Sequence, residues 1–90
     1  MIRSIKHKGL WHFAETGDPS KLGTVDADRI RRILARLDVS VQPHDMNLPG
    51  LAFQYLADVR LYAVRIRDKS RIRFGWHGED AVDVDLEHRT

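Results

Sequence analysis

The sequence predicts an α+β domain in which two helices of the N-terminal half pack on one face of a small, mainly antiparallel sheet. Apolar residues recur at helical spacing in the first half of the chain, whereas from Leu51 onward they recur at every second position. Glycine and proline interrupt the chain between these segments. A length of 90 residues predicts one domain, residues 1–90, so any function must fit on a single small core.

The opening of the chain predicts a short strand followed by a helix. Met1–Ile5 is β-permissive, and in "KHKGLWHFAETG" Leu10 and Phe13 share one helical face. Gly17 ends this helix because glycine accepts the left-handed end position, and Pro19 just after it cannot continue a helix.

The segment "TVDADRIRRILARLD" predicts the second and most regular helix. Asp28 lies four residues before Arg32, which is a favourable charge spacing on a helix. The apolar face of this helix consists of Ile30, Ile33, Leu34 and Leu37. The following "VSVQPHDMNLPG" contains two prolines and is expected to be a connection with one helical turn.

Three alternating segments in the second half predict antiparallel strands with one buried face. "GLAFQYL" before them is a candidate for a further strand. The apolar sets are Tyr62, Val64 and Ile66, then Ile72, Phe74 and Trp76, then Val82, Val84 and Leu86. The helices are expected on this apolar face, which leaves the other face of the sheet open.

Composition excludes several classes of protein. The chain is 42% hydrophobic and 31% charged, as in ordinary globular domains, and it has no cysteine, which excludes disulfides, thiolate metal sites and cysteine nucleophiles. His7 and His12 lack the spacing of a metal-binding pair, so we expect no metal and no cofactor. The apolar runs are too short for a membrane span or a signal peptide, so we expect a cytoplasmic protein without membrane partners.

The stretch "RIRDKSRIRF" concentrates four arginines in two alternating runs. With a three-residue turn at 68–70, strand alternation sets Arg67 opposite Arg71 and Arg65 opposite Arg73. Four guanidinium groups are then expected on one exposed face. Like charges that face each other destabilise a hairpin, so we expect negatively charged groups to lie near these arginines and compensate their charge.

Two explanations of these arginines remain open at the level of sequence. The last strand carries Asp83, Asp85 and Glu87, which predicts a ladder of exposed ion pairs of little net stability. Alternatively the face binds phosphate, which suits the planar fork of arginine. Arg60 and Lys69 add positive charge nearby. His88 follows the last strand and is either a residue of this site, titrating near neutrality, or part of an unstructured tail.

Four motifs, "MIRSIKHKGL", "DRIRRILARLD", "HDMNLPGL" and "DAVDVDLE", resemble the HigB branch of the RelE/ParE toxin superfamily, also called plasmid maintenance killer proteins. The resemblance runs nearly end to end. It implies a RelE-like fold and a metal-independent, ribosome-dependent endoribonuclease that cuts messenger RNA in the A site. It also implies a HigA-like helix-turn-helix antitoxin as partner, with operator DNA bound only through that antitoxin.

The resemblance carries over to individual residues unevenly. Arg71 in "KSR" matches the arginine of the family's "NWR" pattern. The family's "HPLKGD" supplies histidine and lysine, whereas "QYLADV" here offers Gln54 and Ala57, and the family's ending "EDYH" is replaced by "EHRT". The expected catalytic residues are Arg71, Arg73 and His88. The expected RNA-binding residues are Arg60, Arg65, Arg67, Lys69 and Arg89.

The residues and the resemblance therefore leave three candidate functions open. The first is a toxin that cleaves messenger RNA with an altered acid and base set. The second is a nuclease-weak or nuclease-dead module that binds antitoxin or RNA and acts in transcriptional autoregulation. The third is a gyrase inhibitor of the ParE type, which ranks last because the motifs resemble those of HigB specifically.

Overall fold

A computed structural model of the protein describes residues 1–23, 26–67 and 69–88. The predicted α+β class is confirmed, since two helices pack on a four-stranded antiparallel sheet with the strand order β1-β2-β3-β4. The helices are α1 (Lys8–Thr16) and α2 (Ala27–Val39), the short 3-10 turns are η1 (Pro19–Lys21) and η2 (Pro43–Met46), and the strands are β1 (Gln54–Leu56), β2 (Leu61–Arg67), β3 (Ser70–His77) and β4 (Asp80–His88).

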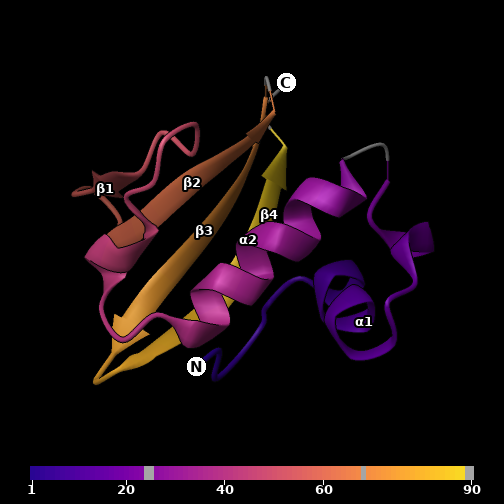
Figure 1. Cartoon of the computed structure of the whole chain (residues 1–90), viewed down its shortest axis with the longest axis horizontal. Helices are drawn as coiled ribbons and strands as arrows, with labels where there is room; N and C mark the ends of the chain where they lie inside the picture. The colour runs from indigo at the N-terminus through magenta and orange to yellow at the C-terminus, as the bar shows by residue number, and fades with distance from the viewer. Residues whose placement is uncertain (24–25, 68, 89–90) are drawn as a thin grey trace.

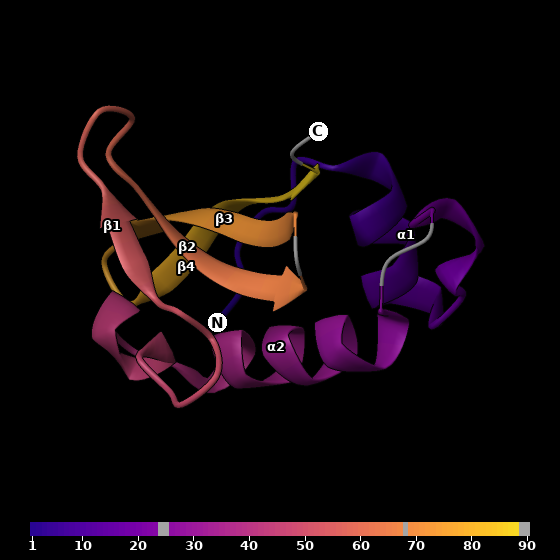
Figure 2. The same cartoon turned by 90° about the horizontal axis from the view of Figure 1, so that it is seen from above.

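The elements form two layers. Helix α2 crosses one face of the sheet, and α1 lies beside α2 past the edge formed by β4 (Figure 1). In the view from above, α2 lies below the sheet and the β1–β2 connection rises on the opposite side (Figure 2). Within the described residues no helix lies over that opposite face, so this open face is available for a site.

Helix α1 begins and ends at residues that suit its ends. The Nδ1 atom of His7 accepts a hydrogen bond from the backbone N–H of Leu10 at 3.0 Å. Gly17 adopts a left-handed φ of 79° and its N–H donates to the carbonyl of Phe13, as predicted. Leu10 and Phe13 point into the core and are buried.

Helix α2 supplies the largest helical part of the core. Asp26 caps it by accepting a hydrogen bond from the N–H of Arg29 at 3.1 Å. The predicted apolar face, Ile30, Ile33, Leu34 and Leu37, is buried. In the residues that the structure describes, neither α2 nor any other helix has the length and apolar character needed to cross a membrane.

Strand β3 forms the centre of the core. Phe74 and Ile72 are 0% exposed beneath the helices, beside the buried Val64 of β2. Aromatic rings continue this layer, because Tyr62 stacks on Phe74 with ring centroids 5.8 Å apart and Trp76 meets the edge of Phe74. The apolar side chains that alternate along β2 and β3 therefore face the helices, as predicted.

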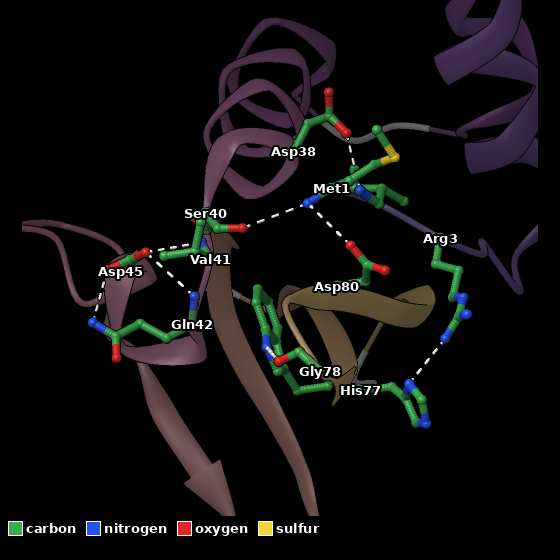
Figure 3. A network of polar contacts seen from close by, with 12 residues as sticks. Met1, Arg3, Asp38, Ser40, Val41, Gln42, Asp45, His77, Gly78 and Asp80 are labelled. Carbon is green, nitrogen blue, oxygen red and sulfur yellow. Dashed lines mark hydrogen bonds and ion pairs between the residues drawn. The ribbon is translucent and has the colours of Figure 1, made fainter.

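The predicted N-terminal strand is present only as two isolated parallel bridges, Ile2 to Ala81 and Ile5 to Val84. A polar network holds this segment between α2 and β4 (Figure 3). The N–H of Ile2 donates to Oδ1 of Asp38 at 2.9 Å. This network joins the first residues of the chain to the end of α2 and to the β3–β4 turn.

A bulge in β4 corrects the predicted pattern of its apolar residues. Asp83 adopts a φ of 51°, and the pairing with β3 shifts between Arg73 and Gly75. Val84 and Leu86 are buried under the helices as predicted, but Val82 pairs with Gly75 and belongs to the open face. The extra residue at the bulge inverts the alternation before it.

We predict that Gly9→Ala destabilises the protein, although alanine favours helix over glycine by about 1 kcal/mol. A Cβ atom at Gly9 would lie 2.1 Å from the carbonyl oxygen of Lys21, and this backbone atom cannot yield without moving η1. The free energy of unfolding should fall by about 1 to 3 kcal/mol in urea titrations followed by circular dichroism. The exposed neighbouring change Lys8→Ala should stay within about 0.5 kcal/mol of the original protein. Equal or higher stability of Gly9→Ala would contradict the packing of α1 on η1.

Candidate functional site

The β2–β3 hairpin has a different register from the predicted one. Arg65 pairs with Arg71, and Arg67 pairs with Ser70, with a bulge between Arg65 and Arg67. Ser70 therefore belongs to β3 instead of the turn, which shifts the pairing by two residues and leaves Arg73 opposite Ala63. Because a shift of two preserves the face of each side chain, Arg65, Arg71 and Arg73 still belong to the open face.

Two rows of paired residues cross the open face. One row runs through Gln54, Ala63, Arg73 and Asp85, and the next runs through Arg65, Arg71 and Glu87. Ala63, which is paired with Gln54 on one side and Arg73 on the other, is only 1% exposed. The rows place three arginines and two carboxylates on neighbouring positions of three strands.

Glu87 joins Arg71 and Arg73 in one cluster of charges. Its Oε1 atom accepts hydrogen bonds from Arg71 at 3.2 Å (Nε) and 3.0 Å (Nη2), and its Oε2 atom accepts from Nη1 of Arg73. The side chains of Arg71 and Arg73 are 17% and 27% exposed, so these two residues of the predicted arginine face are largely covered. Both pack along the sheet because a shared carboxylate holds them there.

The cluster keeps Glu87 ionised. The hydrogen bond from Arg73, and then the one from Arg71, holds the pKa of the Glu87 carboxyl below its ordinary value, although partial burial acts in the opposite direction. The other two predicted acidic partners lie elsewhere. Asp83 is turned by the bulge toward Ser4, and Oδ1 of Asp85 accepts from the N–H of Leu86 at 3.0 Å. The carboxylate of Glu87 thus forms ion pairs with two arginines.

A pocket of about 300 Å³ lies beside this cluster on the open face. Arg65, Lys69 and Arg71 bring positive charge to its walls, and Gln54 adds an amide. The remaining lining residues are Ala52, Ala63, Val64 and Ser70. Within residues 1–23, 26–67 and 69–88, no carboxylate lies within ion-pair distance of Arg65 or Lys69. The pocket is therefore polar, positively charged and floored by small side chains.

The other predicted RNA-binding residues do not line this pocket. Nε of Arg67 lies 3.2 Å from Oδ2 of Asp26 and ties the end of β2 to the start of α2. Arg60 lies in the β1–β2 connection, at the far end of β2 from Arg65, with a φ of 57°. Arg89 lies outside the described residues, as does Asp68 of the predicted turn.

His88 is the last residue of β4 and reaches the pocket through Ser70. Its Nδ1 atom lies 3.0 Å from Oγ of Ser70, with which it is also paired in the sheet. Strand alternation places both residues on the side of Ile72 and Leu86, across the sheet from Glu87. The structure therefore separates His88 from the arginine cluster, although one pocket residue connects them.

Sequence reasoning missed the central role of Glu87. Alternation places it on the polar face, but the sequence does not indicate which of three acids meets which arginine, because the bulge at Asp83 decides this. Gln54 can serve neither as a base nor as a cation, but its amide lines the pocket. Together these groups can bind an anion with several oxygen atoms, using guanidinium forks, an ammonium and an amide.

A comparison with models of known protein families found no match to this chain, and neither did a comparison with curated proteins.

We predict that Glu87→Gln lowers the free energy of unfolding by about 1 to 2 kcal/mol at pH 7, because two arginines lose their ionised acceptor. A lowered pKa in the folded state stabilises the protein above the ordinary glutamate value of about 4.3, and this contribution is lost as the pH falls through the folded pKa. The difference between the two proteins should therefore shrink below about pH 4.

Urea titrations across this pH range measure the effect. Glu79→Gln, the same change at an exposed residue of the β3–β4 turn, serves as the control and should change stability little at any pH. A difference between Glu87→Gln and the original protein that does not depend on pH would contradict the ionised cluster.

Proposed function

We propose that the open face binds the phosphate backbone of single-stranded RNA, and that the protein is the toxin of a type II toxin–antitoxin system that cleaves messenger RNA on the ribosome. The observation that carries the proposal is the pocket walled by Arg65, Lys69 and Arg71. The HigB-like motifs supply the biological setting, including a HigA-like antitoxin and a RelE-like fold. The arrangement of two helices on an antiparallel sheet agrees with the fold that these motifs imply.

Phosphate is the ligand that best suits this chemistry. A phosphodiester offers two anionic oxygen atoms to guanidinium forks, and its neighbours along the backbone reach further cations. Arg71 is prepared for such contacts because Glu87 holds its guanidinium from one side. Arg65, which is exposed across the β2–β3 pair, supplies charge from the other side.

Metal-independent cleavage of RNA needs a base, an acid and cationic groups. The ribose 2′-oxygen forms a bond to phosphorus while the bond from phosphorus to the 5′-oxygen breaks, so one proton leaves the hydroxyl and one reaches the leaving oxygen. We assign charge stabilisation to Arg71 and positioning of Arg71 and Arg73 to Glu87. His88 lies across the sheet from this cluster and contacts only its neighbour Ser70 among the described residues, so it is not assigned the proton transfer. A carboxylate with a lowered pKa is a weak base, which argues for this division.

A second candidate function is an RNA- or antitoxin-binding module without nuclease activity, acting in transcriptional autoregulation. The observation that favours it is the pairing of both Arg71 and Arg73 with Glu87, together with Gln54 at a position where the family supplies histidine. In this case the pocket binds phosphate but lacks an efficient base. Cleavage assays separate the two functions.

Induced expression of the protein should arrest growth, and sequencing of messenger RNA ends on translating ribosomes should reveal new cuts in the A site. Arg71→Ala should lower the cleavage rate by about 100-fold or more, because it removes the cation at the reacting phosphate. Arg71→Lys should recover only part of the rate, since lysine keeps the charge but not the fork. Lys21→Ala, a loss of charge on the helix side, should cleave normally. Tight RNA binding with neither growth arrest nor cleavage would support the second function instead.

Binding of a single-stranded RNA oligonucleotide should weaken steeply with salt. Arg65→Ala and Lys69→Ala should each reduce the affinity and make the slope of log K against log [salt] shallower by about 0.7, the value for one phosphate contact on a single strand. Fluorescence anisotropy at several salt concentrations measures the slope, with Lys21→Ala as the control. An unchanged slope in both variants would exclude the pocket as the phosphate site.

A further inference from the structure

A second positively charged surface lies on the helix layer, away from the open face. Arg29, Arg32 and Arg36 follow one another along α2 at about one residue per turn. They line one side of a groove of about 200 Å³, and the loop before β1 lines the other side. The apolar residues of this groove are Ile33, Leu48, Pro49 and Leu51.

Arg29 has a structural role in this groove. Its Nη2 atom donates to the carbonyl of Gly50 at 2.7 Å and lies 3.4 Å from the carbonyl of Arg65. The N–H of Arg65 in turn donates to the carbonyl of Leu51 at 2.7 Å. Arg29 therefore fixes the loop against α2 and β2, so that the wall of the groove is firmly held.

Arg32 and Arg36 differ from Arg29 because they are exposed and their side chains make no hydrogen bond within the described residues. In the part of the chain that the structure describes, no carboxylate lies within ion-pair distance of either guanidinium. Asp26 and Asp45 attract these arginines only from beyond ion-pair distance. Asp26 caps α2 and pairs with Arg67, and Asp45 accepts the N–H groups of Val41 and Gln42.

The opposite side of α2 shows the contrast. Nη1 of Arg31 lies 2.8 Å from Oδ1 of Asp28, and the guanidinium carbon of Arg31 lies 5.3 Å from the ring centre of Phe13. This arginine has both an ionic and an aromatic partner within the chain. Within the described residues, Arg32 and Arg36 on the groove side of the helix are thus exposed and form no ion pair, unlike Arg31.

We propose that this groove is a docking surface for an acidic, amphipathic helical segment of a partner protein. An aliphatic side chain of the partner packs on Ile33 and Leu48, and carboxylates one turn before and after it meet Arg32 and Arg36. This is the helix-in-groove mode of recognition, with charge complementarity setting the orientation.

The chemistry of the floor favours a protein segment over nucleic acid. The groove is floored by aliphatic residues, and no aromatic ring is among its lining residues to stack on a base. Two guanidinium groups one turn apart match carboxylates at the same spacing on a partner helix. The groove and the RNA pocket share no lining residue, so this inference does not rest on the RNA proposal.

The probe for the test is a fluorescent, alanine-rich helical peptide of about 20 residues that carries one leucine with glutamates one turn before and after it. Fluorescence anisotropy should show saturable binding below about 1 mM. The same peptide with glutamine in place of glutamate should bind at least about tenfold more weakly, because the charged hydrogen bonds are lost.

Variants of the protein identify the surface. The double variant Arg32→Glu, Arg36→Glu should abolish peptide binding, and Leu48→Ser should weaken it about tenfold. The matched control Lys8→Glu, Lys21→Glu makes the same change in net charge on exposed residues near α1 and should bind like the original protein. Circular dichroism verifies that each variant is folded.

Three results would overturn the inference: no saturable peptide binding, equal binding of the glutamate and glutamine peptides, or normal binding by the double glutamate variant. If the double variant loses affinity for single-stranded RNA while its peptide binding is unchanged, the groove is a nucleic-acid surface instead. Loss of RNA binding in Arg65→Ala alone bears only on the open-face pocket, so the two proposals fail separately.

Discussion

Strand β3 is the element on which both the core and the candidate site depend. It hydrogen-bonds to β2 on one side and to β4 on the other, so its alternation is imposed on the whole sheet. Ile72 and Phe74 point to the helices and are completely buried, while Arg71 and Arg73 point to the open face. A change of register in this strand would exchange apolar and charged side chains between the two faces, which ties the position of the arginines to the stability of the core.

The sequence was sufficient to predict the fold class and the face on which the arginines lie, because both follow from strong periodicity. Ile30 and Leu37 on α2, and Ile72 and Phe74 on β3, are buried as their spacing indicates. The bulges could not be predicted in the same way. Asp83 takes a left-handed φ that aspartate tolerates better than most residues, but its neighbours in the sequence do not mark it as a bulge.

The candidate site was predictable by residue type but not by geometry. Alternation identified Arg65, Arg71 and Arg73, whereas their exposure depends on Glu87, a long carboxylate that reaches two strand positions at once. Alternation also predicts Arg67 on this surface, but beside the bulge its guanidinium pairs with Asp26. His88 lies near the site in sequence and across the sheet in space. Charge pairing between long side chains is decided by small shifts of register, which composition and spacing do not encode.

The attachment of the first residues to β4 has a consequence for how the sheet is protected. The hydroxyl of Ser4 accepts a hydrogen bond from the N–H of Asp83, 79 residues away, and donates one to the Asp83 side chain. The N–H groups of Arg3 and Lys6 donate to backbone carbonyls of β4 at 2.8 and 2.7 Å. These bonds occupy backbone groups of β4 that a strand from another molecule would otherwise pair with, while the opposite edge is β1, only three residues long. The long edge strand of the sheet is therefore shielded by the first residues of the same chain, which keeps it from pairing with another molecule.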